Sequence, residues 1–242
     1  MTKLRRYDYL LSVLPALEPI GSVPPMSKRE FLEQVADSNG PVRTVEMLLL
    51  SDDLTQYQAL LTEEITHDKA DSAVLSLDKA QNEAVLPDFL LLEESTEQEQ
   101  GGRSRIDAIW SRYFHHAASV ARRAGSSFLK AWVGFEVGLR NALVIARSHS
   151  LELDPTTYLV GPELADKDMD YSHVVSAWSA AVNPLAAMDV LDKWRWDWLD
   201  ERGRWYSFSA CEIEVYAAKL ALLHHWRRIL SDKQRRNKAS MT

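Results

Sequence analysis

Cysteine is nearly absent from this sequence: Cys211 is the single one among 242 residues. One thiol excludes an internal disulfide and a zinc site built from pairs of cysteines. The chain also lacks a run of about 18 apolar residues, so we expect no segment that inserts into a membrane. The formal net charge of -7 argues against binding to nucleic acid, which requires a positively charged surface. No apolar signal-peptide core follows the basic start, and we expect a cytoplasmic protein.

Motifs for catalysis or for cofactor binding are missing as well. The sequence contains no GxGxxG loop, no Walker sequence and no HExxH. The adjacent pairs His115-His116 and His224-His225 point about 100° apart on a helix, so neither pair can chelate one metal ion. We therefore expect a non-catalytic protein without a cofactor or a metal ion.

The residues that are present predict a mostly α-helical fold. Ser27 and Glu30 form a capping-box pattern at a helix start, and Asn39-Gly40-Pro41 should end that helix. Apolar residues three and four apart predict helices through most of the C-terminal half, with Gly125 bending or splitting the longest segment. Further helices are predicted over Val42–Leu50 and Leu54–Thr66, from Asp154-Pro155, from Asp170 or Ser172, from Pro184 to Leu199, and from about Ser209 to Leu230.

The composition changes sharply in the middle of the chain. Gln, Glu, Ser and Asp dominate residues 68–105, and the stretch 93–102 has no apolar side chain. Such a stretch cannot bury enough surface to offset the entropy lost on ordering, so we predict a flexible acidic linker over 68–105. The linker would separate an N-terminal helical segment, 1–67, from a C-terminal helical domain, 106–242. We expect two lobes of antiparallel, bundled helices.

One polar group interrupts the apolar helix predicted around residue 140. Glu136 and Arg140 are four residues apart in the favourable order for an ion pair, Asn141 follows, and Arg147 lies two turns further on. One interpretation is an ion pair that fixes helix packing, with Asn141 bonded to a neighbouring loop. The alternative is a polar surface that binds a partner.

Tryptophan is concentrated in one short stretch. Trp194, Trp196, Trp198 and Trp205 lie within twelve residues. On a helix Trp194 and Trp198 share a face while Trp196 points elsewhere, so one straight helix cannot bury all of them in one core. Either two lobes of this chain pack together through these rings, or the rings belong to an interface with another protein, where tryptophan is common.

The segment Gly134–Arg147, followed by Leu151–Asp154, resembles a recurring segment of one component of the V/A-type rotary ATPases, the subunit called d in eukaryotes. Tyr7–Leu10 and Phe208–Tyr216 also look similar to parts of that subunit. The whole chain more closely resembles an uncharacterised bacterial family that is encoded beside V/A-type ATP synthase subunits.

This resemblance implies an all-α scaffold without catalytic residues or cofactor, which caps the membrane rotor ring and receives the central stalk. The expected function is therefore that of an accessory or central-stalk-like subunit, with other ATPase subunits as its partners. The protein would then lie at the inner membrane through that complex. The alternative is a stand-alone helical adaptor that binds some other protein.

Overall fold

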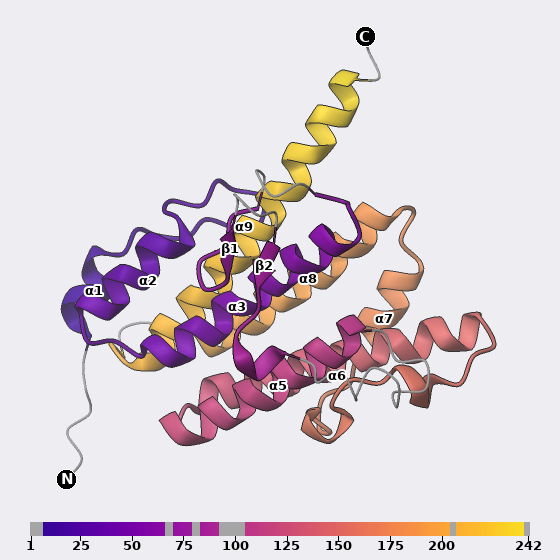
Figure 1. Ribbon diagram of the computed structural model, residues 1–242, viewed down its shortest axis with the longest axis horizontal. Helices are drawn as coiled ribbons and strands as arrows, with labels where there is room; N and C mark the ends of the chain where they lie inside the picture. The colour runs from indigo at the N-terminus through magenta and orange to yellow at the C-terminus, as the bar shows by residue number, and fades with distance from the viewer. Residues whose placement is uncertain (1–6, 66–69, 79–82, 92–104, 204–206, 240–242) are drawn as a thin grey trace. The chain divides into compact units, whose positions relative to one another are not determined.

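The computed structural model describes residues 7–65, 70–78, 83–91, 105–203 and 207–239. Helices dominate these residues, as predicted, and two short strands pair in a small sheet (Figure 1). In chain order the elements are α1 (Asp8–Val13), α2 (Lys28–Asp37), α3 (Val42–Leu61), β1 (Ser76–Asp78), β2 (Glu83–Val85), η2 (Asp88–Leu90), α5 (Arg105–Ala124), α6 (Ser127–Ser150), η3 (Pro155–Tyr158), η4 (Pro162–Leu164), α7 (Ser172–Ser179), α8 (Pro184–Arg202) and α9 (Ala210–Ala239).

The chain divides into two compact units, and one of them is built from both ends of the sequence. Unit 1 comprises Met1–Asn82 and Asp192–Thr242, and unit 2 comprises Glu83–Leu191. The predicted division into 1–67, 68–105 and 106–242 differs from these units. The reason is packing: α9 lies against α2 and α3, so the last part of the chain belongs with the first.

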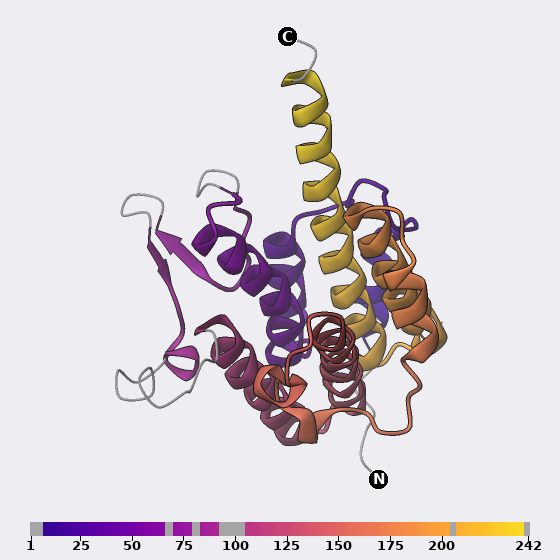
Figure 2. The same cartoon turned by 90° about the vertical axis from the view of Figure 1, so that its right-hand side faces the viewer.

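Unit 1 is organised around α9, which contacts α3 along much of its length and also contacts α2. Its core consists of apolar side chains from these three helices, among them Phe31, Val35, Leu49, Leu50, Leu220 and Leu223, each 0% exposed. Burial of this surface is the main favourable contribution to the stability of the unit. The C-terminal turns of α9 extend past α2 and α3 in both views (Figures 1 and 2).

The first helices of unit 1 follow the sequence prediction, and the next departs from it. The Ser27 hydroxyl accepts a hydrogen bond from the Glu30 amide, and Gly40 donates to the Val35 carbonyl at the end of α2. The prediction of two helices, Val42–Leu50 and Leu54–Thr66, is wrong, because α3 runs unbroken from Val42 to Leu61. The carboxylates of Asp52 and Asp53 are bonded to other elements, so they do not compete with the backbone of this helix.

The predicted linker is packed at both of the places where the structure describes it. Ala70 and Leu75 are buried in unit 1, and Leu86 and Leu90 are buried in unit 2. Burial of these apolar side chains favours the ordering of the two segments. The acidic stretch 93–102, on which the prediction mainly rested, lies outside the described residues.

Unit 2 is built on a hairpin of α5 and α6. Gly125, with φ of 67°, makes the reversal between them, and the Ser126 hydroxyl caps α6 by accepting from the Leu129 amide. The predicted split at Gly125 is therefore confirmed. Along α6 pack η3, η4 and α7, whereas η2 packs on α5. The start predicted at Asp154-Pro155 is the short 3₁₀ helix η3.

Two glycines one turn apart on α6 allow the chain segment before α7 to come close. A Cβ atom at Gly138 would lie 2.2 Å from the Tyr171 hydroxyl oxygen, whereas one at Gly134 would have its nearest contact at 3.4 Å. The Gly134 carbonyl accepts from the Asp166 amide at 3.0 Å, and the Tyr171 hydroxyl donates to the Phe135 carbonyl at 3.3 Å. The missing side chain of Gly138 thus makes room for the tyrosine ring.

Replacing Gly138 by alanine should destabilise the protein, because the new methyl group must displace a half-buried ring. We expect a loss of about 1–3 kcal/mol in the free energy of unfolding, as for other overpacked sites. Gly134→Ala is the matched control, since it adds the same group to the same helix at an ordinary contact distance. That variant should be neutral or more stable, and equal urea-unfolding midpoints for the two variants would contradict this account.

Candidate functional site

A cluster of charged side chains lies in the interior of unit 1, and its centre is Lys28. This lysine lies in the first turn of α2 and is 1% exposed. Its Nζ is 2.6 Å from Asp52 Oδ2 and 2.7 Å from Asp53 Oδ1. Burial opposes the charged amine, but the two carboxylates prevail and raise the pKa of Lys28. The side chain is therefore an ammonium ion and not a free amine that could act as a nucleophile.

Asp52 connects α3 to α9. Its two oxygens accept from the guanidinium of Arg228 in a bidentate pair, with Nη1 3.1 Å from Oδ2. Oδ2 also accepts from Gln56 at 3.2 Å. Burial raises the pKa of Asp52, but Lys28 and Arg228 outweigh burial and hold it far below the ordinary value. This carboxylate is thus ionised, and side chains of α2, α3 and α9 all donate to it.

Asp53, 1% exposed, holds the loop that leads into β1. Its Oδ2 accepts from three successive backbone amides, those of Ala73 at 2.9 Å, Val74 at 2.7 Å and Leu75 at 3.0 Å. Successive amides that converge in this way form an anion-binding nest. Gln56 fastens the same loop, because its side-chain amide exchanges hydrogen bonds with the backbone of Asp71.

Two adjacent histidines of α9 border the cluster. His224 Nε2 lies 2.9 Å from the Met26 carbonyl, which can only accept, so this nitrogen carries the proton. His225 lies between two carboxylates: Nδ1 is 3.9 Å from Asp52 Oδ1, and Nε2 is 4.0 Å from Asp192 Oδ2. Burial is the largest influence on both rings and lowers the pKa of each below 6.5. His224 and His225 can each take up a proton, whereas Lys28, Asp52, Asp53 and Arg228 are bonded to one another.

The predicted polar group of α6 serves internal contacts in unit 2. Arg140 Nη2 donates to Asp107 Oδ1 at 3.1 Å, and the guanidinium lies 5.0 Å from the centre of the Trp110 ring. Glu136, one turn away, adds a weaker favourable field. Asn141 is buried, and its amide exchanges two hydrogen bonds, of 3.0 and 2.9 Å, with the backbone of Val160. These contacts correspond to the packing interpretation, with Asn141 fixing a loop.

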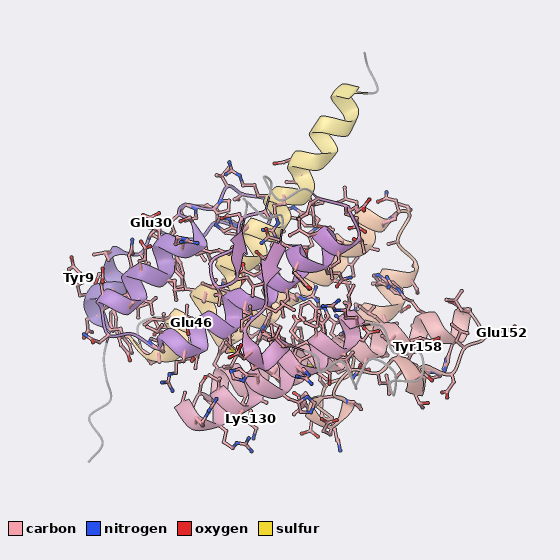
Figure 3. The ribbon with its side chains drawn as sticks, viewed as in Figure 1. Tyr9, Glu30, Glu46, Lys130, Glu152 and Tyr158 are labelled. Atoms are coloured by element: carbon pink, nitrogen blue, oxygen red, sulfur yellow. The ribbon has the colours of Figure 1, made fainter. Side chains whose placement is uncertain are left out.

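Arg147, Leu151 and Leu153 lie at the surface. The Arg147 side chain is exposed, and its guanidinium stacks 5.1 Å from the centre of the Trp178 ring of α7. Three apolar side chains close by in the chain are also exposed: Ile145 by 39%, Leu151 by 66% and Leu153 by 45%. We call Ile145, Arg147, Leu151, Leu153 and Trp178 the α6-end surface. Figure 3 labels Glu152 at this end of α6.

One residue at the α6-end surface, Glu152, has a backbone conformation that is unusual for any residue other than glycine. Glu152 has φ of 55°, in the left-handed region that favours glycine, and Leu153 donates to the Ser148 carbonyl at 2.9 Å. This is a helix-terminating turn in which a hydrophobic residue usually folds back on the helix. Here Leu153 remains 45% exposed, so the turn presents apolar surface to solvent.

The predicted tryptophan cluster contacts other side chains of unit 1. Trp198 is buried, and the Arg202 guanidinium lies 3.7 Å from the centre of its ring. Lys219 of α9 places its ammonium group 4.8 Å from the ring of Trp196. Trp194 and Trp196 are half-buried, and Trp205 lies outside the described residues. Trp196 therefore helps to join α8 to α9 by a cation–π contact, whereas the contact of Trp198 with Arg202 lies within α8.

Comparison with known proteins does not show a family for this chain. No family model matches it, and neither a curated protein nor a solved structure does. Within the described residues, no helix has the length and apolar character needed to cross a membrane. In the same part of the chain, no three His, Cys, Asp or Glu side chains are grouped so that they could hold a metal ion.

The sequence interpretation missed the charged cluster, although a local signal was present. Lys28 lies three and seven residues before Phe31 and Val35, both fully buried, so it occupies the apolar face of α2. Asp52 and Asp53 likewise interrupt the apolar run of α3. A charge on an apolar helix face indicates a buried partner, but only the tertiary fold brings α2, α3 and α9 together.

Lys28→Met should strongly destabilise the protein, because it leaves two carboxylates buried without their shared cation. Breaking a buried ion pair from one side costs about 3–5 kcal/mol, and we expect a loss in that range in urea unfolding. Lys130→Met is the control, because Lys130 is exposed on α6 and its replacement should change stability by less than about 0.5 kcal/mol. Similar losses for both variants would show that Lys28 does not hold the cluster.

Stability should also fall as the pH drops below about 6.5, the ordinary histidine value. His224 and His225 have lowered pKa values in the folded state, so the unfolded chain binds protons first and acid favours unfolding. The stabilisation from the two neutral rings is complete above that pH and is lost as the pH falls through their folded pKa values. His225→Gln should reduce the slope of unfolding free energy against pH, and an unchanged slope would contradict the assignment.

Proposed function

We propose that this chain is a non-catalytic helical subunit that binds other proteins through the α6-end surface, and that V/A-type rotary ATPase subunits are its partners. The observation that carries the proposal is the composition of this surface. Exposed leucine and isoleucine side chains lie close in the chain to an arginine that is stacked on a tryptophan. Arginine and tryptophan are the residue types that contribute most to binding in protein interfaces.

The internal contacts of the charged cluster support a scaffold more than an enzyme. Lys28, Asp52 and Asp53 saturate one another and the neighbouring amides, which leaves no activated amine or carboxylate for a substrate. Such a network specifies one arrangement of its helices and does so at little gain in stability. A protein whose task is to transmit force or to hold partners in register benefits from helices fixed in this way.

The choice of partner rests on the resemblance of residues 134–154 to the rotor-capping component of these ATPases. Within that segment, Arg140 and Asn141 serve internal contacts, whereas Arg147, Leu151 and Leu153 are exposed. The part of the segment that remains accessible is therefore its end. The alternative, a stand-alone adaptor, uses the same surface and differs in the protein that is bound.

A tagged full-length chain, purified from the cells that encode it, should retain ATPase subunits identified by mass spectrometry. Leu151→Asp combined with Leu153→Asp should abolish this co-purification, because charges replace the apolar contacts. Leu61→Asp is the matched control: Leu61 is 47% exposed, against 45% for Leu153, and it lies at the end of α3 in unit 1. This control should retain the partners.

Each of three further outcomes would contradict a part of the proposal. A different protein lost in the double variant would establish the adaptor function in place of the ATPase role. ATPase subunits that remain bound to the double variant would show that the α6-end surface is not the contact. A chain recovered without any partner would contradict the binding function itself.

A further inference from the structure

His225 occupies a position in the charged cluster that neither the helix packing nor the proposed function requires. Its two ring nitrogens point toward carboxylates on different helices, Asp52 of α3 and Asp192 of α8, at 3.9 and 4.0 Å. Both distances are longer than a hydrogen bond. Asp192 is 2% exposed, and its Oδ2 accepts no hydrogen bond within the described part of the chain.

The chemistry of imidazole limits the contacts that the neutral ring can make here. A neutral ring has one N–H donor and one lone pair, so it can donate to only one of two carboxylates. A protonated ring donates from both nitrogens and can serve Asp52 and Asp192 together. The two carboxylates are therefore placed to accept from a protonated ring, but neither lies within hydrogen-bond distance of it in this structure.

The charges around His225 act on its proton in opposite directions. The groups that face the cluster are Lys28 from α2, Asp52 and Asp53 from α3, Asp71 from the loop before β1, Asp192 and Arg195 from α8, and His224 and Arg228 from α9. The two carboxylates nearest the ring, Asp52 and Asp192, favour a proton on His225, whereas the positive charges of Arg195 and Arg228 oppose it.

Asp192 keeps one oxygen that a protonated His225 can use. Arg195 bonds Asp192 Oδ1 at 2.9 Å within the same helix, whereas Oδ2 accepts no hydrogen bond within the described residues. Arg228, in contrast, holds both oxygens of Asp52. A protonated His225 can therefore donate to Asp192 Oδ2 while Arg195 keeps Oδ1.

We infer that His225 is a proton-operated latch between α8 and α9. On protonation His225 donates to Asp192 Oδ2 and to Asp52, so the ion pair within α8 is joined by ion pairs that connect α9 to α8 and to α3. The latch is open at neutral pH and closes when acid protonates the ring. The influences on the ring agree with this direction: burial lowers the pKa of His225, Asp192 and Asp52 raise it, and Arg228 and Arg195 lower it.

The test is the titration of His225 in the intact chain, followed by long-range ¹H–¹⁵N NMR of the imidazole nitrogens. Asp192→Asn should lower the His225 pKa, because it removes a carboxylate that favours the proton. Arg195→Gln should raise it and increase proton affinity several-fold, because it removes a positive charge that repels the protonated ring. Asp197→Asn, at an exposed position of the same helix, should leave the titration unchanged.

A double-mutant cycle separates a latch from a simple packing role. The coupling between His225→Gln and Asp192→Asn in the free energy of unfolding should be small well above the measured midpoint of His225 and should grow below it. Equal coupling on both sides of the midpoint, or a His225 titration that neither Asp192→Asn nor Arg195→Gln moves, would overturn the inference. Should Asp192→Asn fail to fold, the Arg195→Gln titration still decides, since Arg195 is partly exposed.

Discussion

The ammonium group of Lys28 lies between two adjacent carboxylates in the interior of unit 1, and the arrangement of the unit depends on this contact. A buried charge is tolerated only where its partners are in place, because desolvation costs several kcal/mol or more for each ion. Once Asp52 and Asp53 turn toward Lys28, their remaining oxygens must find donors. Arg228 of α9 and the amides of residues 73–75 provide them, so one lysine sets the positions of α2, α3, α9 and the loop before β1.

The same contact explains why the two ends of the chain fold as one unit. Apolar burial brings α2, α3 and α9 together without specifying how the helices rotate or slide against one another. The bidentate pair of Asp52 with Arg228 allows one register, since a shift of one residue would turn either side chain away. Polar specificity therefore complements apolar stability, and His225 and Asp192 extend it to α8 at the edge of the network.

Whether the sequence could predict a feature depends on how far apart along the chain the interacting residues lie. The capping of α2 by Ser27 and the break at Gly125 depend on residues within one turn, and both predictions were correct. The carboxylates of Asp52 and Asp53 within α3 are bonded to Lys28 and to Arg228, the latter 176 positions from Asp52, and the prediction of two separate helices could not take these distant partners into account. The order of residues 70–78 likewise depends on Asp53 and Gln56, whose bonds cross from another element.

In the segment around Arg140, most of the residues that the sequence singled out make contacts inside the protein. Gly138 admits the Tyr171 ring, Arg140 joins α6 to α5, and Asn141 fixes the backbone of Val160. Each of these residues has an internal partner that accounts for its type, so none needs an external partner to explain it. Arg147, Leu151 and Leu153 differ, because exposed leucines at a left-handed turn contribute little to folding. Arg147 stacks on Trp178, whereas internal packing does not explain the two leucines, and contact with another protein is the reason that we propose for them.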